Sequence, residues 1–353
     1  MKISPDTTLA EIGESGAWRV VRPYVARSGA GAISTGFGDD AAVEDIERPG
    51  RLVSTCDLFI EGVHFLAEWG DWRAIGRKAM AVNISDLAAM AARPARALVS
   101  VGLPPDFRAR DLRALYWGLS AEARRWGAAI VGGDTTRADR ATIHVAAWGW
   151  APPGRKMPLR SRARPGMGLF VTGSLGDSAA GLALLADPRY AGLKEKGYAR
   201  RLIRRHRLPE PRVEEALALA ESLGEWAAMD LSDDLGRSVS LLARASGVCV
   251  EAESSALPVS RELIAFERDA AGMGERASAE GPAAPRRWAI GGGGEDYELL
   301  FAAAAELEEL RAAFRRRGLR RAISRIGAIS ACPKGGARLD RRPWPCQGFE
   351  HFR

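Results

Sequence analysis

The alternation of apolar and polar positions divides the first half of the chain into short strands and amphipathic helices. Apolar runs bounded by Gly, Pro or Asp predict strands at residues 51–65, 95–104, 128–136 and 141–152. Apolar positions at helical spacing predict helices at residues 71–92, with an interruption near Asn83, and at 109–127. Strands that alternate with helices along a chain indicate an α/β architecture.

The second half repeats this pattern after residues 151–167, a stretch rich in Pro, Gly and Arg that has the composition of a linker. An apolar strand joined to a glycine or acidic turn occurs three times, at residues 168–186, 226–247 and 289–304. We therefore expect a fold of the α/β (α+β) class with two domains, residues 1–150 and 151–353. The low-complexity residues 272–287 are expected to form a mobile loop.

Size and composition are those of a globular protein with a sizeable core. The chain has 353 residues, of which 46% are hydrophobic and 27% charged. No apolar run reaches the roughly 18 residues of a membrane helix, and the first residues lack the apolar segment of a signal peptide. These features predict a cytoplasmic protein. The four cysteines form no CxxC pair and are expected to be reduced thiols.

The net charge of +7 is carried largely by arginine, with basic runs at residues 200–207 and 315–321. Such runs are found both on nucleic-acid-binding faces and on solvated helix faces. No aromatic-rich RNA-binding motif or zinc-finger pattern accompanies them, so we favour solvated helix faces.

Aspartates recur where an apolar element meets a loop. Each has Gly, Ser or Thr within two residues, and the set comprises Asp39, Asp40, Asp57, Asp86, Asp134, Asp230 and Asp233. A single aspartate of this kind is typically a helix cap or a turn former. Six junctions of the same kind point to a shared chemical role instead.

Electrostatics limits what a group of carboxylates can do. Two like charges about 4 Å apart repel by about 4 kcal/mol at an effective dielectric constant of about 20. Carboxylates that share a site therefore bind protons or cations. Oxygen ligands without Cys or His favour Mg²⁺ over zinc, and Mg²⁺ commonly bridges carboxylates to substrate phosphates. The aspartates predict a site with several Mg²⁺ ions for a polyphosphate.

No Walker A motif is present to hold the phosphates of a nucleotide. Two glycine turns offer backbone N–H groups that could bind anions, at residues 171–181 and 132–136. An ordinary strand-to-helix turn explains the first of these equally well, and the sequence leaves both interpretations open.

An ordered set of motifs between residues 36 and 352 resembles the thiamine-monophosphate kinase family, of the superfamily that includes aminoimidazole ribonucleotide synthetase and selenophosphate synthetase. The motifs are GFGDDAAV, DLFIEGVHF, AVNISDLAAM, VGGDTTR, VTGSLGDSAAGLALL, DLSDDL, GGEDYELLF and GFEHF. The resemblance implies that ATP phosphorylates thiamine phosphate to thiamine diphosphate, the last step of thiamine diphosphate biosynthesis. It implies an N-terminal domain that binds ATP and Mg²⁺ and pairs in a homodimer, and a C-terminal α/β domain that closes the active site. Neither nucleic acid nor membrane is implied as a partner.

The motif match also implies roles for single residues. Metal ligands are expected at Asp40, Thr55, Asp57, Asp86, Asp134, Asp230 and Asp233. Nucleotide contacts are expected at Tyr116, Gly133, Asp134, Arg160 and Ser232. Contacts to thiamine phosphate are expected at His64, Glu295 and Phe349. Without the resemblance, His64 and Arg160 would be surface residues, Phe349 a C-terminal anchor and Tyr116 a helix core residue.

Four glycines precede Glu295 and Asp296 in the stretch GGGGEDYELLF, residues 291–301. Glycine lets a backbone pass close to a ligand. Glu295 would then face the thiazolium ring, which carries a fixed positive charge, while Asp296 would cap the turn. The phosphate acceptor is already ionised, so alignment and charge neutralisation suffice and no catalytic base is assigned. We expect direct in-line transfer without a phosphoenzyme.

The sequence departs from the family pattern at a few places. Cys56 replaces a hydroxyl residue or threonine, Asp234 replaces a glycine, and residues 91–94 replace a glycine-containing turn. Asp234 is expected to be a helix-start residue with negative φ rather than a metal ligand.

Two other functions remain as alternatives at this stage. One is an ATP-dependent enzyme of the same superfamily, such as an aminoimidazole ribonucleotide synthetase. The other is a basic nucleic-acid-binding protein, which would show a steep salt dependence and no turnover.

Overall fold

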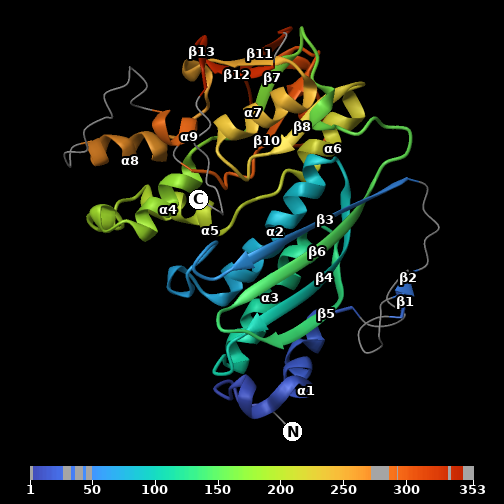
Figure 1. Cartoon of the computed structure of the whole chain (residues 1–353), viewed down its shortest axis with the longest axis vertical. Helices are drawn as coiled ribbons and strands as arrows, with labels where there is room; N and C mark the ends of the chain where they lie inside the picture. Colours follow the sequence, from blue (N-terminus) through green and yellow to red (C-terminus); the bar gives the residue numbers. More distant parts are fainter. Residues whose placement is uncertain are drawn as a thin grey trace. The chain divides into compact units, whose positions relative to one another are not determined.

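The computed structural model describes residues 3–26, 33–35, 43–44, 50–271, 286–291, 293–332 and 335–344, with only the backbone at 14–15, 33–35 and 43–44. The chain divides into two compact units (Figure 1). Unit 1 comprises Met1–Leu87 and Ala92–Gly154, and unit 2 comprises Ala88–Ala91 and Arg155–Arg353. Both units combine helices with sheets, which confirms the predicted two-domain α/β class.

Unit 1 is built around a sheet of mixed direction. Its helices are α1 (Leu9–Val21), α2 (Trp72–Ala89) and α3 (Ala109–Arg125), with the 3-10 turns η1 (Arg22–Tyr24) and η2 (Ala67–Trp69). Its described strands are β1 (Ile33–Thr35), β2 (Val43–Glu44), β3 (Arg51–Ile60), β4 (Arg93–Leu103), β5 (Ala129–Arg137) and β6 (Thr142–Ala151). Four of these form a sheet in the order β3-β6-β4-β5, in which only β4 and β5 run parallel.

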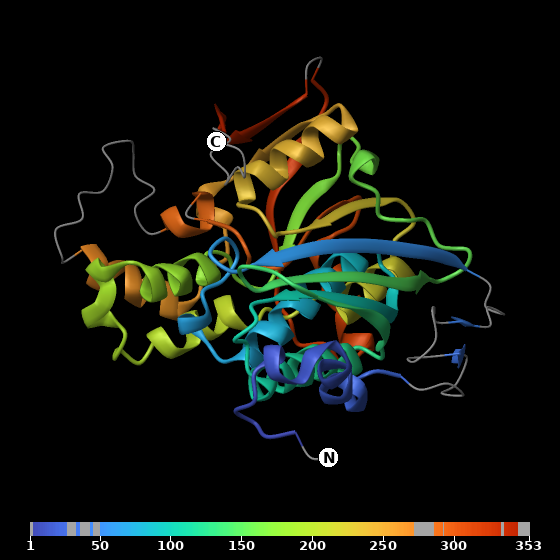
Figure 2. The ribbon, with the colours of Figure 1, turned by 60° about the horizontal axis from the view of Figure 1, so that its bottom comes forward.

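Helices α2 and α3 lie on one face of this sheet (Figures 1 and 2). Two glycines let the helices approach closely. A side chain at Gly76 would come within 2.2 Å of the Leu115 carbonyl oxygen, and one at Gly118 within 2.1 Å of the Arg73 carbonyl oxygen. Neither position tolerates a Cβ atom, so these glycines fix how α2 crosses α3.

Helix α2 is continuous through Asn83, so the predicted interruption is wrong. The Asn83 side-chain N–H donates to the Ala79 carbonyl one turn earlier, at 3.0 Å, and so gives its amide nitrogen a partner inside the helix. The helix ends in a Schellman motif, in which Ala91 N donates to Ala88 O and Ala92 N donates to Leu87 O. Ala91 takes a left-handed φ of 51°, at the turn where the family pattern has glycine.

Unit 2 is built around a larger sheet. Its helices are α4 (Asp177–Ala186), α5 (Ala199–Arg207), α6 (Val213–Ser222), α7 (Leu235–Ser246), α8 (Arg261–Ala271), α9 (Arg287–Gly291) and α10 (Leu307–Arg316), with the 3-10 turns η3 (Arg160–Arg162), η4 (Pro188–Leu193) and η5 (Ser254–Ala256). Its strands are β7 (Gly168–Thr172), β8 (Trp226–Asp230), β9 (Cys249–Ala252), β10 (Leu299–Ala303), β11 (Ile323–Ser330), β12 (Gly336–Leu339) and β13 (Arg342–Pro343). The described strands are ordered β13-β12-β9-β11-β7-β10-β8.

The neighbouring strands β7, β10 and β8 are buried along their whole length because both faces of the sheet are covered here. Leu169 and Val171 point into a core shared with α7, while Phe170 between them points into a core shared with α6 and α10. This is why the strands read as continuous apolar runs rather than alternating ones. A third core joins α4, α5 and α8, which lie side by side in Figure 1.

Two expectations about unit 2 are wrong. Residues 151–167 are not merely a linker, because Ala163 and Met167 are buried in the core and Pro158 O accepts from Ala228 N. Cys249 and Cys332 form a disulfide, with Cα atoms 5.4 Å apart, rather than two reduced thiols. Cys56 is exposed and free. Among the helices of the described ranges, none combines the length and the apolarity that crossing a membrane requires.

Candidate functional site

Three predicted site residues of unit 1 come together where β3 faces α2. Thr55 Oγ1 donates a hydrogen bond of 2.6 Å to Asp86 Oδ2. Asp57 follows two residues along the same face of β3. Burial, and then the negative charge of Asp86, raise the pKa of Asp57 to about 6. The two carboxylates therefore repel each other, and a cation beside them would remove the cost of ionising Asp57.

This donor set fits a hard divalent cation such as Mg²⁺. Its atoms are all oxygens, from one hydroxyl and two carboxylates, and it contains no thiolate or imidazole. Nowhere in the described parts of the chain do three His, Cys, Asp or Glu side chains gather as metal ligands. The fit is that of Mg²⁺ sites in which one or two carboxylates act together with water and substrate phosphates.

Gly133, Asp134 and Tyr116 lie at the β5 side of unit 1. A side chain at Gly133 would come within 1.7 Å of the Val99 carbonyl oxygen, so close packing between β4 and β5 already requires glycine. Asp134 is exposed and accepts from the N–H of Thr135 at 2.8 Å. Tyr116 is 1% exposed, and burial followed by the charge of Asp134 raises the pKa of its hydroxyl. Tyr116 is thus a helix core residue next to Asp134.

His64 lies in the turn after β3. The Ile60 N–H donates to His64 Nδ1 at 3.1 Å, and the imidazole packs against Phe59 with ring centroids 5.5 Å apart. The turn therefore fixes the orientation of the ring, and Nε2 carries the proton of the neutral form. The half-buried His64 is held more tightly than an ordinary surface residue.

In unit 2 the segments DLSDD and GGEDYE run side by side. Glu295 N donates to Ser232 O at 2.8 Å, Tyr297 N donates to Leu231 O at 2.9 Å, and Leu231 N donates to Glu298 O at 2.9 Å. These bonds continue the β8–β10 pairing beyond the strand ends. Two predicted contact residues from distant parts of the sequence, Ser232 and Glu295, are thereby brought together.

The glycines before Glu295 have a structural reason. A side chain at Gly294 would come within 2.3 Å of the Ser232 carbonyl oxygen. The close approach that requires glycine is thus to the protein's own backbone. Glu295 and Tyr297 themselves adopt left-handed φ values of 65° and 49°. Left-handed conformations cost about 1–2 kcal/mol per residue, so the surrounding contacts must hold this segment in place.

The aspartates of DLSDD have different surroundings. Asp230 is buried at the end of β8. Asp233 is partly exposed, with its carboxylate 3.1 Å from Arg237 Nε. Asp234 is the N-cap of α7, with φ −63°, and its side chain accepts from Arg237 N at 2.9 Å. The expected negative φ and helix-start position of Asp234 are confirmed, although the residue caps the helix directly instead of lying in its first turn.

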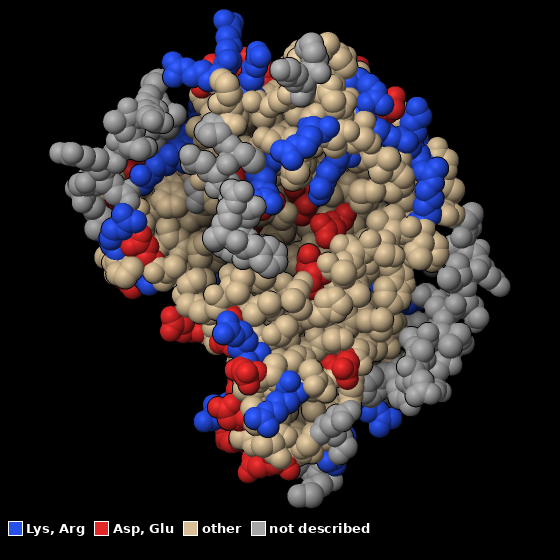
Figure 3. Space-filling view, in the orientation of Figure 1, with Lys and Arg blue, Asp and Glu red and all other residues tan. Residues whose placement is uncertain are grey.

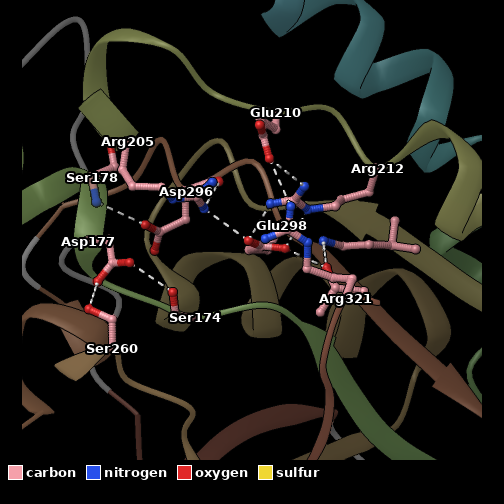
Figure 4. Close-up of polar contacts among 12 residues, drawn as sticks. Ser174, Asp177, Ser178, Arg205, Glu210, Arg212, Ser260, Asp296, Glu298 and Arg321 are labelled. Carbon is pink, nitrogen blue, oxygen red and sulfur yellow. Dashed lines mark hydrogen bonds and ion pairs between the residues drawn. The ribbon is translucent and has the colours of Figure 1, made fainter. Parts of the chain in front are cut away.

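The Asp296 carboxylate binds backbone N–H groups at the N-terminus of α4. It accepts from Gly176 N at 2.7 Å and from Ser178 N at 3.1 Å (Figure 4). Burial raises the pKa of Asp296 to about 7. Of the two interpretations left open for residues 171–181, this favours the ordinary turn, because the anion that meets these N–H groups is an internal carboxylate. Asp296 therefore caps a distant helix start, rather than its own turn as the sequence had predicted.

Glu298 forms an ion pair with Arg212, drawn in Figure 4, in which both side chains are buried. It is 0% exposed and accepts from Arg212 Nε and a terminal Arg212 nitrogen, each at 2.6 Å. Arg205 donates to the same carboxylate at 2.9 Å, and Thr172 Oγ1 donates at 2.7 Å. The charge of Arg212 holds the pKa of Glu298 below its ordinary value despite the desolvation that opposes it.

His206 was missed by the sequence reasoning. Its Nδ1 lies 3.3 Å from Glu295 Oε2 and 3.2 Å from Ser178 Oγ. Both partners contact the same nitrogen, so the three residues cannot relay a proton in the manner of a Ser-His-acid triad. The sequence shows only an imidazole inside a basic run that predicts a solvated helix face, whereas the structure buries this position of α5.

Several arginines of the two basic runs are paired with acidic residues. Arg317 bonds to Glu214 and Glu221 at 2.6 and 2.5 Å, and Arg321 bonds to Glu210 at 2.8 Å. On the face shown in Figure 3, basic side chains are separated by acidic and uncharged ones.

The exposed Arg160 lies in η3, where its carbonyl accepts from Ser246 Oγ. Asp40 and Phe349 lie outside the described residues.

Comparisons with known proteins agree with this arrangement. Residues 38–151 match the family model described as "AIR synthase related protein, N-terminal domain". The thiamine-monophosphate kinase of Bacillus subtilis (strain 168) is 34% identical over 273 residues, which cover 76% of this chain and 77% of that protein. The crystal structure of thiamine-monophosphate kinase from Stenotrophomonas maltophilia K279a is 31% identical and aligns with a TM-score of 0.76 over 93% of this chain and 96% of that chain.

A second solved structure, "AaThiL complexed with AMPPCP and TMP", is 30% identical with a TM-score of 0.71 and covers 99% of this chain and 100% of that one. Identity of this level over most of both chains goes beyond a shared fold. The chain belongs to the thiamine-monophosphate kinase family.

Proposed function

We propose that the protein transfers the γ-phosphoryl group of ATP to thiamine phosphate and so forms ADP and thiamine diphosphate, the last step of thiamine diphosphate biosynthesis. Family membership supports this reaction, as does the relative that holds AMPPCP, an ATP analogue, together with TMP, which we take to be thiamine phosphate. The observation that carries the proposal is the bond from Glu295 N to Ser232 O. This bond places Glu295, whose carboxylate is suited to a cationic heterocycle, beside the segment of Asp230 and Asp233, which are suited to bind the cations of a polyphosphate.

Several Mg²⁺ ions would neutralise the polyphosphate. The residues that would hold them are Thr55, Asp57 and Asp86 in unit 1, with Asp134, Asp230, Asp233 and Asp40 as further ligands. When bound, Mg²⁺ supplies positive charge that offsets the charge developing on the transferred group. The chain's own part is to orient the carboxylates, as the hydrogen bond from Thr55 does for Asp86.

Transfer would be direct and in line, without a phosphoenzyme. The acceptor is a phosphate oxygen that is already ionised at neutral pH, so no general base is needed, and positioning supplies most of the rate. Glu295 would face the thiazolium ring, with His64 and Phe349 as further contacts to thiamine phosphate. Gly133, Arg160 and Ser232 would contact the nucleotide, and the buried Tyr116 would pack next to Asp134 and hold it in position.

We also propose the cytoplasm as the location, since the reaction consumes ATP.

The open face of the unit 1 sheet supports a homodimer formed through the N-terminal domain. Along β3 the outward residues Leu52 and Leu58 are 53% and 47% exposed, and Leu98 on β4 is 38% exposed. Side chains of β6 alternate between buried and partly exposed, and Trp148 and Trp150 lie on the partly exposed side. A stable pair of subunits typically buries about 800 Å² on each partner, and an apolar sheet face of this kind is suited to that burial.

A substrate comparison tests the function. The purified protein is incubated with ATP and Mg²⁺ and with either thiamine phosphate or formylglycinamidine ribonucleotide, the substrate of the aminoimidazole branch of the superfamily. We expect thiamine diphosphate from the first and no ADP from the second. Turnover of the ribonucleotide alone would assign the chain to the other branch.

ATP chirally labelled at the γ-phosphorus tests whether transfer is direct. Direct in-line transfer predicts inversion of configuration at phosphorus, and transfer through a phosphoenzyme predicts retention.

A further inference from the structure

The segment that carries Glu295 is locally strained and externally held. Glu295 and Tyr297 have positive φ values, with Asp296 between them. Besides its backbone bonds to Leu231 and Ser232 and the contact of His206 with Glu295, three groups of side-chain contacts fix the segment. The Asp296 carboxylate is bound by the start of α4, the Glu298 carboxylate is bound by Arg212, and Arg205 contacts both residues (Figure 4).

Arg205 differs from the other side chains that hold the segment because it contacts the residues on both sides of Tyr297. One terminal nitrogen of its guanidinium donates to the Asp296 carbonyl at 3.3 Å and to the Glu298 carboxylate at 2.9 Å. The side chain is 13% exposed, so solvent does not substitute readily for these bonds. Between the two acceptors lies Tyr297, one of the two left-handed residues.

We propose that Arg205 is a positioning residue for thiamine phosphate recognition, which acts by holding the Glu295–Glu298 segment in its left-handed conformation. This inference rests on the proposed function, in which Glu295 faces the thiazolium ring. Asp296 and Glu298 are then the two attachment points of the bridge. Without the Arg205 bridge, the backbone at Glu295 and Tyr297 leaves the left-handed conformation, and the Glu295 carboxylate loses its fixed direction.

The nucleotide side of the site does not depend on this bridge. Ser232 follows the buried strand β8 and precedes the cap of α7, and both elements remain held without Arg205. A merely structural arginine would instead affect both substrates, or stability alone. The ratio of the two Michaelis constants therefore distinguishes positioning from support of the fold.

The test compares Arg205→Gln with Arg204→Gln, which removes an equal charge from an exposed position of the same helix. For Arg205→Gln we expect KM for thiamine phosphate to rise roughly tenfold, with KM for ATP within about threefold of wild type. Amide exchange at Glu295 and Tyr297, whose N–H groups donate to Ser232 and Leu231, should become faster. Arg204→Gln should match wild type in every measurement.

Arg205→Lys provides a second, milder variant. An ammonium keeps the charge but lacks the reach of the guanidinium fork, so KM for thiamine phosphate should lie between wild type and Arg205→Gln. If Arg205→Gln does not fold, Arg205→Lys alone tests the bridge: a KM for thiamine phosphate above that of wild type, with KM for ATP unchanged, supports it, and a wild-type KM for thiamine phosphate overturns it. Equal changes in both Michaelis constants, or unchanged amide exchange, would also overturn it. A wild-type protein that forms no thiamine diphosphate would refute the proposed function and this role together.

Discussion

At the scale of single residues, the surroundings of each carboxylate indicate its role. Asp57 and Asp86 repel each other and leave oxygens for a cation. Asp234 is occupied by the N–H of Arg237 and caps a helix, and Asp296 is occupied by the start of α4. The sequence shows all of these as similar aspartates beside small residues. Their hydrogen-bond partners separate the candidate ligands from the caps.

Asp86→Asn should lower turnover roughly a hundredfold or more, which is about 2.7 kcal/mol in the barrier. The substitution keeps the hydrogen-bond acceptor for Thr55 but removes the charge that would hold a cation. Asp106→Asn, at an exposed turn, is the matched control and should be silent. Turnover at saturating ATP and thiamine phosphate is measured, with circular dichroism to show that the fold is intact. A fully active Asp86→Asn enzyme would refute its assignment as a metal ligand.

Asp234→Gly should keep activity within roughly tenfold, or about 1.4 kcal/mol in the barrier. Glycine at an N-cap costs only a few tenths of a kcal/mol, so stability should fall slightly. Asp233→Asn, next to it, should abolish turnover because Asp233 is a proposed cation ligand. Turnover of both variants is followed as Mg²⁺ is titrated. A shifted Mg²⁺ requirement in Asp234→Gly would instead make Asp234 part of the metal site.

At the scale of elements, several features depend on contacts that no local pattern reports. Helix α2 ends in a turn at Ala91, which has the left-handed conformation. Helix α8 buries the carboxyl group of Glu267. A disulfide links Cys249 of β9 to Cys332, which follows β11. Each has a consequence for stability that can be measured without an activity assay.

Ala91→Gly should be nearly neutral for stability, whereas Ala92→Gly should be destabilising. Both variants lose a buried methyl group, about 0.8 kcal/mol, and both make the unfolded chain more flexible, about 0.4–1 kcal/mol. Only at Ala91 does glycine also relieve a left-handed φ, which returns about 1–2 kcal/mol. Urea unfolding measures the difference. Equal losses in the two variants would show that the turn is not strained.

The pH dependence of stability should change when Glu267 is replaced by Gln. Burial raises the pKa of Glu267 from an ordinary value of 4.5 to about 7. The folded state therefore binds the proton more tightly than the unfolded state, and the contribution of this group falls as pH rises from about 4.5 to 7. The free energy of unfolding of wild type relative to Glu267→Gln should fall by about 2–3 kcal/mol over that range. A difference that is constant with pH would contradict this.

Reduction should destabilise unit 2. The bond between Cys249 and Cys332 closes a loop with a sequence separation of 83 residues, for which chain entropy predicts a stabilisation of about 4–5 kcal/mol. Cys332→Ser should lower the urea midpoint, and dithiothreitol should bring wild type to the same value. Cys56→Ser, at an exposed free cysteine, is the control. No response of wild type to the reductant would show that the bond is absent in solution.

At the scale of the whole molecule, the strand and helix pattern and the ordered motifs were sufficient to predict the α/β class and the family. Contacts between residues far apart in the sequence were not predictable. The contact of Ser232 with Glu295 depends on the strand order β10-β8, and the contact of His206 with Glu295 depends on the packing of α5. The Cys249–Cys332 bond likewise depends on β9 lying beside β11. Periodicity reports one element at a time, so such pairs appear only when the elements are assembled.

The most direct test of the account follows the phosphoryl group itself. ATP labelled at the γ-phosphorus is incubated with thiamine phosphate, Mg²⁺ and the purified protein, and the products are separated. The account predicts that the label appears in the terminal phosphate of thiamine diphosphate, with one ADP formed for each. Label that appears only as inorganic phosphate, or ADP formed without thiamine diphosphate, would contradict it.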